Sequence, residues 1–136
     1  MQKIVDMNAI KKILEKSKVI ALVGFSPKEN RPSNLVGRYL MDAGYTVIPV
    51  NPGQTEIAGR KCYASLTEIP EKVDIVDIFR KPEDVVPIVE EAIAIGAGVI
   101  WMQLDVVNEQ AAALAEAAGL TVIMDRCIKI DHSNLF

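Results

Sequence analysis

Hydrophobic and polar positions follow two alternating patterns along the chain. Short continuous apolar runs indicate strands that are covered on both faces, and they occupy residues 19–23, 45–50, 74–79, 99–102 and 120–124. Between them, apolar residues recur at the three-to-four-residue spacing of amphipathic helices, in residues 8–16, 33–43, 82–93 and 109–118. The chain therefore alternates strands with helices.

Residues at the ends of these segments support the boundaries. Asn8, Ser33 and Asn108 have side chains that cap helix N-termini, so each is expected to begin a helix. Pro82 suits the first turn of a helix, where a missing N–H leaves no hydrogen bond unmade, and Gly44 suits the residue after a helix. Residues 54–65 fit neither pattern and are expected to form an extended connection.

This alternation predicts an α/β protein with a doubly wound, five-stranded parallel sheet and helices on both faces. The expected strand order is 3-2-1-4-5, in which the runs 19–23 and 99–102 are neighbours. Their crossovers would leave in opposite directions at that point. The crevice between residues 25–32 and 101–106 is therefore the predicted binding site.

Composition limits the classes of function. The chain has 136 residues, half of them hydrophobic, which suits a single domain over residues 1–136. A net charge of −3 argues against binding to nucleic acid or to an anionic membrane, and no apolar run could span a bilayer. Since residues 1–6 do not resemble a signal peptide, we expect a cytoplasmic protein. Two cysteines and one histidine favour reduced thiols and no metal site.

The segment 19–33 carries the first candidate chemistry. Gly24 follows an apolar strand and precedes a helix, as in phosphate-binding loops, but Ser26 stands where a G-x-G-x-x-G motif has its second glycine. A plain strand-to-helix turn is the alternative. Arg31 can bind a phosphate through two hydrogen bonds, and the N–H groups at a helix start attract anions. We therefore expect a pyrophosphate group at this loop.

The residue after the second strand bears on which nucleotide is bound. NAD sites usually carry an acidic residue there for the ribose hydroxyls, whereas this chain has Asn51. A neutral residue tolerates a phosphorylated ribose, which Arg80 and Lys81 on the next strand's loop could reach. A solvated strand end is the alternative for these two cations. The residues alone thus predict a nucleotide with a pyrophosphate group, other than NAD.

Four segments together resemble a known family. They are residues 23–27 (VGFSP), residues 49–52 (PVNP) followed by 57–59 (IAG), residues 100–104 (IWMQL) and residues 124–129 (MDRCIK). They are similar to the small single-domain CoA-binding proteins, which in turn resemble the CoA-binding domain of the succinyl-CoA synthetase alpha subunit. The similarity runs from residue 18 to residue 136. It implies a Rossmann-like domain that holds coenzyme A, with the 3′-phosphorylated ADP part across the loops after the first three strands.

The resemblance also implies positions for the ligand. It places Gly24, Phe25, Ser26 and Pro27 at the diphosphate, Asn51 and Pro52 beside the adenosine, and residues 79–82, including Phe79, Arg80 and Lys81, along the same rim. Arg31 and Lys81 are supported by their charge and not by the family pattern. The family usually has a glycine after its Trp-x-Gln-x segment, where this chain has Asp105, and that difference concerns the wall along which the pantetheine arm would lie.

Trp101 and Gln103 point to the same face of their strand. For Trp101, a core position with a satisfied indole N–H and a contact with the ligand are both open. Gln103 is a polar amide at the carboxyl end of a buried strand, so it should have a partner. We expect it to contact ligand or water in the crevice.

Candidate reactive groups lie near the C-terminus. We expect Cys127 to be an inert, buried cysteine after the last strand. The alternative is a thiol whose pKa is lowered by Arg126 or Lys129 and which could then form a mixed disulfide with bound coenzyme A. His132 is expected to be solvated. Residues 128–136 could pack back on the sheet or dock on a second subunit, so a homodimer or another protein partner stays open.

The sequence thus predicts a protein that binds coenzyme A or an acyl-CoA without catalysis of its own, as a carrier, a sensor or a partner-binding module. The alternative is an NAD(P)-linked or acyl-transfer enzyme that uses Cys127.

Overall fold

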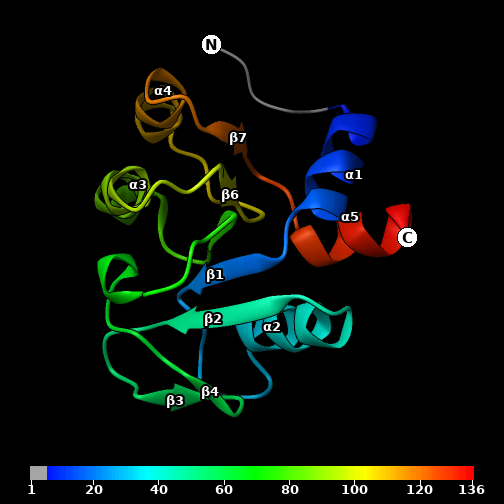
Figure 1. Ribbon diagram of the computed structural model, residues 1–136, viewed down its shortest axis with the longest axis vertical. Coiled ribbons are helices and arrows are strands. Elements are labelled where there is room, and N and C mark those ends of the chain that lie inside the picture. The colour runs from blue at the N-terminus through cyan, green and yellow to red at the C-terminus, as the bar shows by residue number, and fades with distance from the viewer. Residues whose placement is uncertain (1–5) are drawn as a thin grey trace.

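A parallel sheet runs through the centre of the molecule, as the computed structural model of residues 6–136 shows (Figure 1). All its neighbouring strands pair in parallel. In spatial order the five strands are β2 (Thr46–Val50), β1 (Val19–Val23), β5 (Ile75–Ile78), β6 (Val99–Met102) and β7 (Thr121–Ile123). A small antiparallel hairpin lies beyond β2 and consists of β3 (Glu56–Ile57) and β4 (Arg60–Lys61).

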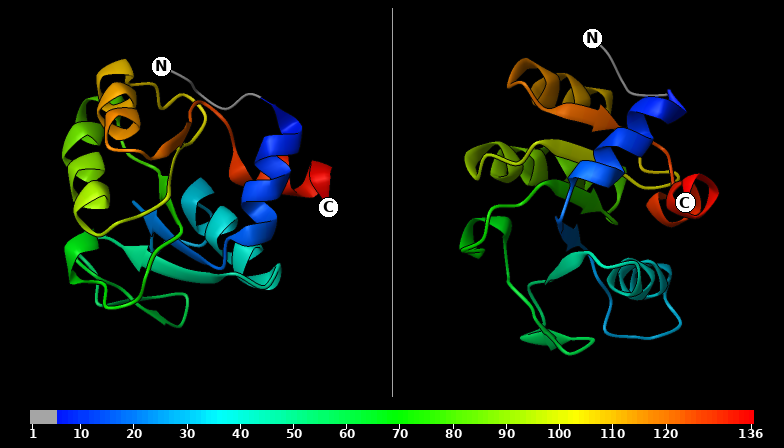
Figure 2. Two further views of the ribbon diagram at one scale, coloured as in Figure 1. Left: turned by 45° about the horizontal axis from the view of Figure 1, so that its top comes forward. Right: turned by 45° about the vertical axis from the view of Figure 1, so that its right-hand side comes forward.

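Helices cover both faces of this sheet (Figures 1 and 2). One face carries α3 (Val85–Ala94) and α4 (Glu109–Ala117), and the other carries α1 (Met7–Lys16), α2 (Pro32–Asp42) and α5 (Ile128–Leu135). Two 3-10 turns, Leu66–Glu68 and Pro82–Asp84, precede β5 and α3 respectively. The predicted α/β class with a doubly wound, five-stranded parallel sheet is confirmed.

One assignment within the predicted order 3-2-1-4-5 needs correction. The place beside β2, which the third strand holds in that order, belongs to the connection between β2 and β5, where Tyr63 forms a single parallel bridge with Val50. The run 74–79, expected as the third strand, is β5 and lies on the other side of β1. The order therefore applies only when the bridged connection counts as the third strand. That connection has no continuous apolar run, so the hydrophobic pattern did not identify it.

This correction moves the point at which the crossovers diverge. β1 leads into α2 on one face and β5 leads into α3 on the other, and these two strands are neighbours. In doubly wound sheets, ligands bind beyond the carboxyl ends of strands at such a point. The site is thus expected between β1 and β5, and not between β1 and β6.

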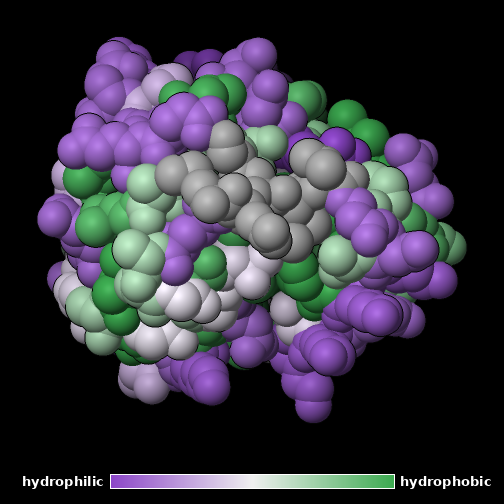
Figure 3. All heavy atoms as spheres, turned by 90° about the horizontal axis from the view of Figure 1, so that it is seen from above, coloured by the Kyte–Doolittle hydropathy of each residue, from purple (hydrophilic) through white to green (hydrophobic). Residues whose placement is uncertain are grey.

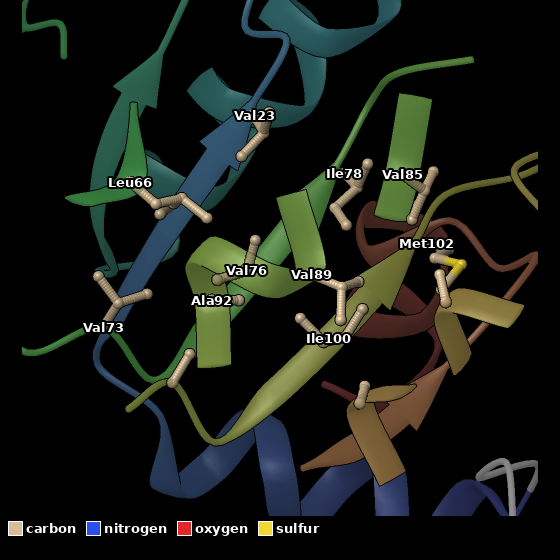
Figure 4. Close-up of a cluster of buried hydrophobic side chains, with 14 of the residues drawn as sticks. Val23, Leu66, Val73, Val76, Ile78, Val85, Val89, Ala92, Ile100 and Met102 are labelled. Atoms are coloured by element: carbon tan, nitrogen blue, oxygen red, sulfur yellow. The ribbon is translucent and has the colours of Figure 1, made fainter. Parts of the chain in front are cut away.

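Alternate residues of the strands build two separate cores, because successive side chains point to opposite faces. Toward α3 and α4, Val23, Ile78 and Met102 pack with Val85 and Val89 (Figure 4). Toward α1, α2 and α5, the strands contribute Ile20, Leu22, Ile75, Trp101 and Ile123. All five strands are therefore buried on both faces, as their continuous apolar runs predict.

Helix starts differ from the predicted caps in two places. Asp6, not Asn8, caps α1, and its carboxylate accepts a hydrogen bond from the Asn8 N–H at 2.9 Å. Arg31 takes the N-cap position of α2, so Ser33 lies inside the first turn. The Asn108 cap is confirmed, because its side-chain oxygen accepts from the Ala111 N–H at 2.9 Å.

The C-terminal segment packs back on the domain. Helix α5 contacts α1 and α2, and its own residues Ile128 and Asp131 are buried. His132 accepts or donates a hydrogen bond with the Tyr39 hydroxyl at 2.8 Å and stacks on Phe136. Burial lowers the pKa of His132, so this histidine is not the solvated tail residue that the sequence predicts.

Hydrophobic and hydrophilic residues are interspersed on the surface seen from above (Figure 3). None of the helices in residues 6–136 is long and apolar enough to cross a membrane.

Candidate functional site

A cleft of about 590 Å³ opens at the carboxyl ends of β1, β5 and β6, and we call it the main cleft. It combines the predicted segments 25–32 and 101–106 with the loop after β5, which the corrected strand order brings next to β1. Nine of the twelve predicted site residues line it: Gly24, Ser26, Pro27, Arg31, Asn51, Phe79, Arg80, Lys81 and Gln103.

Gly24, directly after β1, lies against the backbone of Phe79, directly after β5. Its φ is +90°, a conformation that side chains disfavour, and an added Cβ would overlap the carbonyl oxygen of Phe79. The Gly24 N–H donates to the carbonyl of Val50 at 2.9 Å, so the residue also ties β1 to β2. A glycine is required here for packing, whatever the loop binds.

Hydrogen bonds within the loop after Gly24 fix its shape. The Ser26 N–H donates to the Ser33 hydroxyl at 2.8 Å, and the Asn34 amide donates to the Ser26 carbonyl at 2.8 Å. The Ser26 hydroxyl accepts from the Lys28 N–H at 3.1 Å. The loop is therefore held on the first turn of α2, whose N-terminal residues line the main cleft.

Phe25 does not line the main cleft. Its side chain is fully buried and packs against Gly37 of α2, where an added Cβ would overlap the ring. Phe25 thus anchors the loop to α2, and only its backbone lies near the cleft residues.

Asn51 joins the loops after β1 and β2. Its amide donates to the Phe25 carbonyl at 3.1 Å, and its side-chain oxygen accepts from the Gly53 N–H at 3.0 Å. A carboxylate could not donate the first of these bonds. The hydrogen bond to Phe25 is therefore a structural reason for a neutral residue at position 51, and the sequence analysis did not identify it.

Charged groups stand on two sides of the main cleft. Arg31 lies at the start of α2, while Arg80 and Lys81 lie on the loop after β5. Two carboxylates, Asp84 and Asp105, also line the cleft. The three cations face the same space as the N-terminus of α2, which makes this wall suitable for an anion.

A second, smaller hollow of about 160 Å³ adjoins the main cleft through Arg80, and we call it the side hollow. Its walls are mostly apolar and come from β1, β2, α3 and the connection after β2, with Val23, Val50, Ile88 and Pro52 among them. Pro52, another of the twelve predicted site residues, lies here and not in the main cleft. The size and lining of the side hollow suit a flat aromatic base.

Trp101, the last of the three predicted site residues outside the main cleft, is a core residue. Its side chain is 0% exposed, and its indole N–H donates to the Arg126 carbonyl at 2.8 Å. Gln103, one step further along the same face, is 4% exposed and lines the main cleft. Its side-chain oxygen accepts from the Ile128 N–H at 3.1 Å. The two residues therefore differ in access to the cleft although they share a face.

Asp105 keeps the backbone conformation that favours glycine. Its φ is +69°, and its N–H donates to the Asp125 carboxylate at 2.7 Å. Asp125 also has a positive φ of 61°. Asp105 thus takes a left-handed conformation, which favours glycine, and contributes a carboxylate to the cleft wall.

Cys127 lines a third hollow of about 160 Å³, the thiol hollow, together with Leu104, Asp125, Arg126, Ile130 and Asp131. Its side chain is half-buried at the edge of the core, so it is not the fully buried cysteine that the sequence analysis describes. Arg126 binds Asp131 at 2.7 and 2.8 Å, and this hydrogen bonding raises the pKa of Arg126. His132 lies in a different hollow, among Leu14, Tyr45 and Phe136. The structure therefore does not bring Cys127 and His132 together.

Two lining residues were not predicted as site residues. Ser33 and Asp84 lie outside the predicted crevice segments and also line the main cleft. Ser33 carried a signal, because a buried serine near a helix start usually holds a neighbouring loop. Within residues 6–136, no three metal-ligating side chains come together.

Comparisons with known proteins agree with this architecture. YneT, an uncharacterized protein of Bacillus subtilis, is 45% identical over 124 residues, which cover 91% of this chain and 92% of YneT. A hypothetical protein from Pyrococcus horikoshii has a similar structure, with 43% identity and a TM-score of 0.95 over 99% of this chain and 96% of that one. A Thermus thermophilus structure is 34% identical, with a TM-score of 0.93 over 97% of this chain and all of its own.

A larger enzyme contains a similar part. The ADP-forming acetate–CoA ligase I of Archaeoglobus fulgidus is 32% identical over 129 residues, which cover 87% of this chain and 19% of the ligase. This chain thus spans about a fifth of the ligase's length. Residues 18–133 match the family described as CoA binding domain. The chain therefore belongs to the CoA binding domain family.

Proposed function

We propose that this protein binds coenzyme A or an acyl-CoA in the main cleft, without catalysis of its own. The observation that carries the proposal is the wall formed by Arg31, Arg80 and Lys81 around a preformed glycine loop at the N-terminus of α2. In a member of the CoA binding domain family, this wall suits the phosphates of the cofactor.

The diphosphate is assigned to the loop between Gly24 and Ser33. The positive end of the α2 dipole and the guanidinium of Arg31 both favour an anion there. Because the loop is held by its own hydrogen bonds, little conformational entropy is lost when the anion binds.

The adenosine is assigned to the side hollow, beside Asn51 and Pro52. Val23, Val50 and Ile88 supply apolar contact for the base. Arg80 lines both the side hollow and the main cleft, and Lys81 follows it, so both lie where a 3′-phosphate on the ribose could be bound. A cofactor without this phosphate would leave that charge unpaired.

Binding without catalysis is supported by the surroundings of Cys127. An acyl-transfer enzyme would need a base beside the nucleophile. The one histidine of the chain, His132, is hydrogen-bonded to Tyr39 and lines another hollow. The carboxylate of Asp131 is bound to Arg126.

Isothermal titration with coenzyme A, 3′-dephospho-CoA and NAD tests the proposal. We expect coenzyme A to bind most tightly, and Arg31→Ala to weaken it by about tenfold through the loss of a charge-assisted contact. Lys72→Ala is the matched control, since Lys72 is an exposed cation at the opposite edge of the sheet, before β5. Equal or stronger binding of NAD would overturn the proposal.

A further inference from the structure

The thiol hollow lies next to the main cleft, and the proposed function does not use it. The two share one residue, Leu104, which lines both. We infer that the sulfur end of bound coenzyme A reaches the thiol hollow, where Cys127 undergoes thiol–disulfide exchange with a CoA disulfide. This inference rests on the proposed function and adds a reaction to the same site.

The order of the strands gives the direction of the pantetheine arm. Along the carboxyl edge the loops follow the sheet order β2, β1, β5, β6, β7. With the adenosine in the side hollow at β2 and β1 and the diphosphate at α2, the rest of the main cleft extends over the β6 loop, residues 103–106. The next loop along this edge follows β7 and carries Cys127.

The side chain of Leu104 separates the main cleft from the thiol hollow. It is 52% exposed and stands on a loop, outside both cores. An exposed side chain can change rotamer without the cost of repacking a core. The arm could therefore pass from the main cleft into the thiol hollow along Leu104.

Gln103 supplies an independent sign of a ligand on this path. Its side chain is 96% buried and lines the main cleft, and its oxygen is bound to the Ile128 N–H. Its amide nitrogen has no protein acceptor within residues 6–136. The side chain is otherwise buried, so this donor faces the main cleft and is available to a ligand there, and the pantetheine arm offers two amide carbonyls. The bond to Ile128 also fixes Gln103 relative to the adjacent Cys127.

Cys127 is placed for exchange. It is a free cysteine at the N-cap of α5, and no side chain caps the helix there. Its half-buried side chain lines the thiol hollow. Two carboxylates, Asp125 and Asp131, also line the thiol hollow, and Arg126 neutralises the second.

The exchange balances without an external oxidant. The Cys127 thiol first loses its proton to solvent, and the thiolate attacks one sulfur of the CoA disulfide. A bond forms between Sγ and that sulfur while the sulfur–sulfur bond of the reagent breaks. One coenzyme A leaves as a thiolate and takes up a proton from solvent. The disulfide of the reagent is thereby replaced by a protein–CoA disulfide.

Intact-mass spectrometry after incubation with CoA disulfide tests this step. We expect one CoA adduct per chain, reversed by dithiothreitol, and formed at least about tenfold faster than the adduct with glutathione disulfide at equal concentration, because binding raises the local concentration of the sulfur. Excess reduced coenzyme A should slow it. Cys127→Ser should lose the adduct, whereas Cys62→Ser should keep it, since Cys62 is buried elsewhere.

Failure of this inference is distinguishable from failure of the proposed function. Cys127→Ser should still bind reduced coenzyme A in the same titration, which also shows that the variant is folded. If the wild type binds coenzyme A but reacts with CoA disulfide no faster than with glutathione disulfide, or reacts at Cys62, the inference is overturned while the binding function stands. If the wild type does not bind coenzyme A, both are overturned.

Discussion

The carbonyl oxygen of Phe79 occupies the space that a side chain on Gly24 would need. The two residues follow β1 and β5, the neighbouring strands from which the crossovers diverge. The floor of the main cleft therefore depends on a close approach of two backbones, and this approach is possible because one of them carries no Cβ.

Replacement of Gly24 by alanine should lower the free energy of unfolding by at least about 2 kcal/mol, since a left-handed backbone and an overlap act together. Urea denaturation measures the loss. Gly119→Ala is a matched control with the same φ of +90° and no atom within 4 Å of the added Cβ, so it should lose only about 1 kcal/mol. Equal losses in the two variants would show that the contact with Phe79 has no energetic weight.

The assignment of the 3′-phosphate predicts a selective effect at Lys81. Lys81→Ala should weaken coenzyme A by about five- to tenfold and leave 3′-dephospho-CoA unchanged, because the lost ammonium group would have no other partner in the shorter ligand. Titration of both ligands into both proteins measures the difference, with Lys72→Ala as the control. A similar loss for the two ligands would place Lys81 at the diphosphate instead.

Hydrophobic pattern predicted the strands well because burial on both faces leaves a continuous apolar run. The order of the strands was harder to predict, since the connection of residues 51–74 does not reveal on which side of β1 the chain returns. Tyr63 contributes a single bridge beside β2, and no run of apolar residues marks it. The pattern describes each strand's surroundings but not its neighbours.

The site shows the same division between local and non-local information. The glycine loop and its cations follow from residue types near one strand end, and the structure brings them into one cleft. Trp101 lies within β6 and Gln103 lies just after it, so whether either side chain reaches the cleft depends on where the strand ends. The alternation of side chains along one strand does not encode that end. Likewise, the amide of Asn51 donates to the carbonyl of Phe25, a residue distant in sequence, and the sequence pattern does not reveal this contact.

The core position of Trp101 predicts a variant with a structural effect and no effect on binding. Trp101→Phe should cost about 1–3 kcal/mol, because it leaves the Arg126 carbonyl without its donor and opens a small cavity. The titration of coenzyme A should stay within a factor of about two of wild type. If the folded variant bound coenzyme A about tenfold more weakly than wild type, Trp101 would contribute to binding and not only to the core.

Asp77 is the unusual residue of the sheet. It lies on β5 between Leu22 of β1 and Trp101 of β6, its side chain is 0% exposed, and neither carboxyl oxygen has a hydrogen-bond partner within residues 6–136. Burial raises the pKa of Asp77 well above its usual value of about 3.8. The folded protein therefore holds a proton on Asp77 at pH values where the unfolded chain has lost it.

This proton makes stability depend on pH. Above the pKa of the unfolded chain, the folded state binds more protons, so the free energy of unfolding falls as pH rises, up to the folded-state pKa, by about 1.4 kcal/mol per pH unit. Asp77→Asn has no such proton. Its stability relative to wild type should therefore increase with pH, as measured by urea denaturation between about pH 4.5 and pH 7. Asp84→Asn, at an exposed carboxylate, is the control. A constant difference between Asp77→Asn and wild type across this range would mean that Asp77 is ionised in the folded protein.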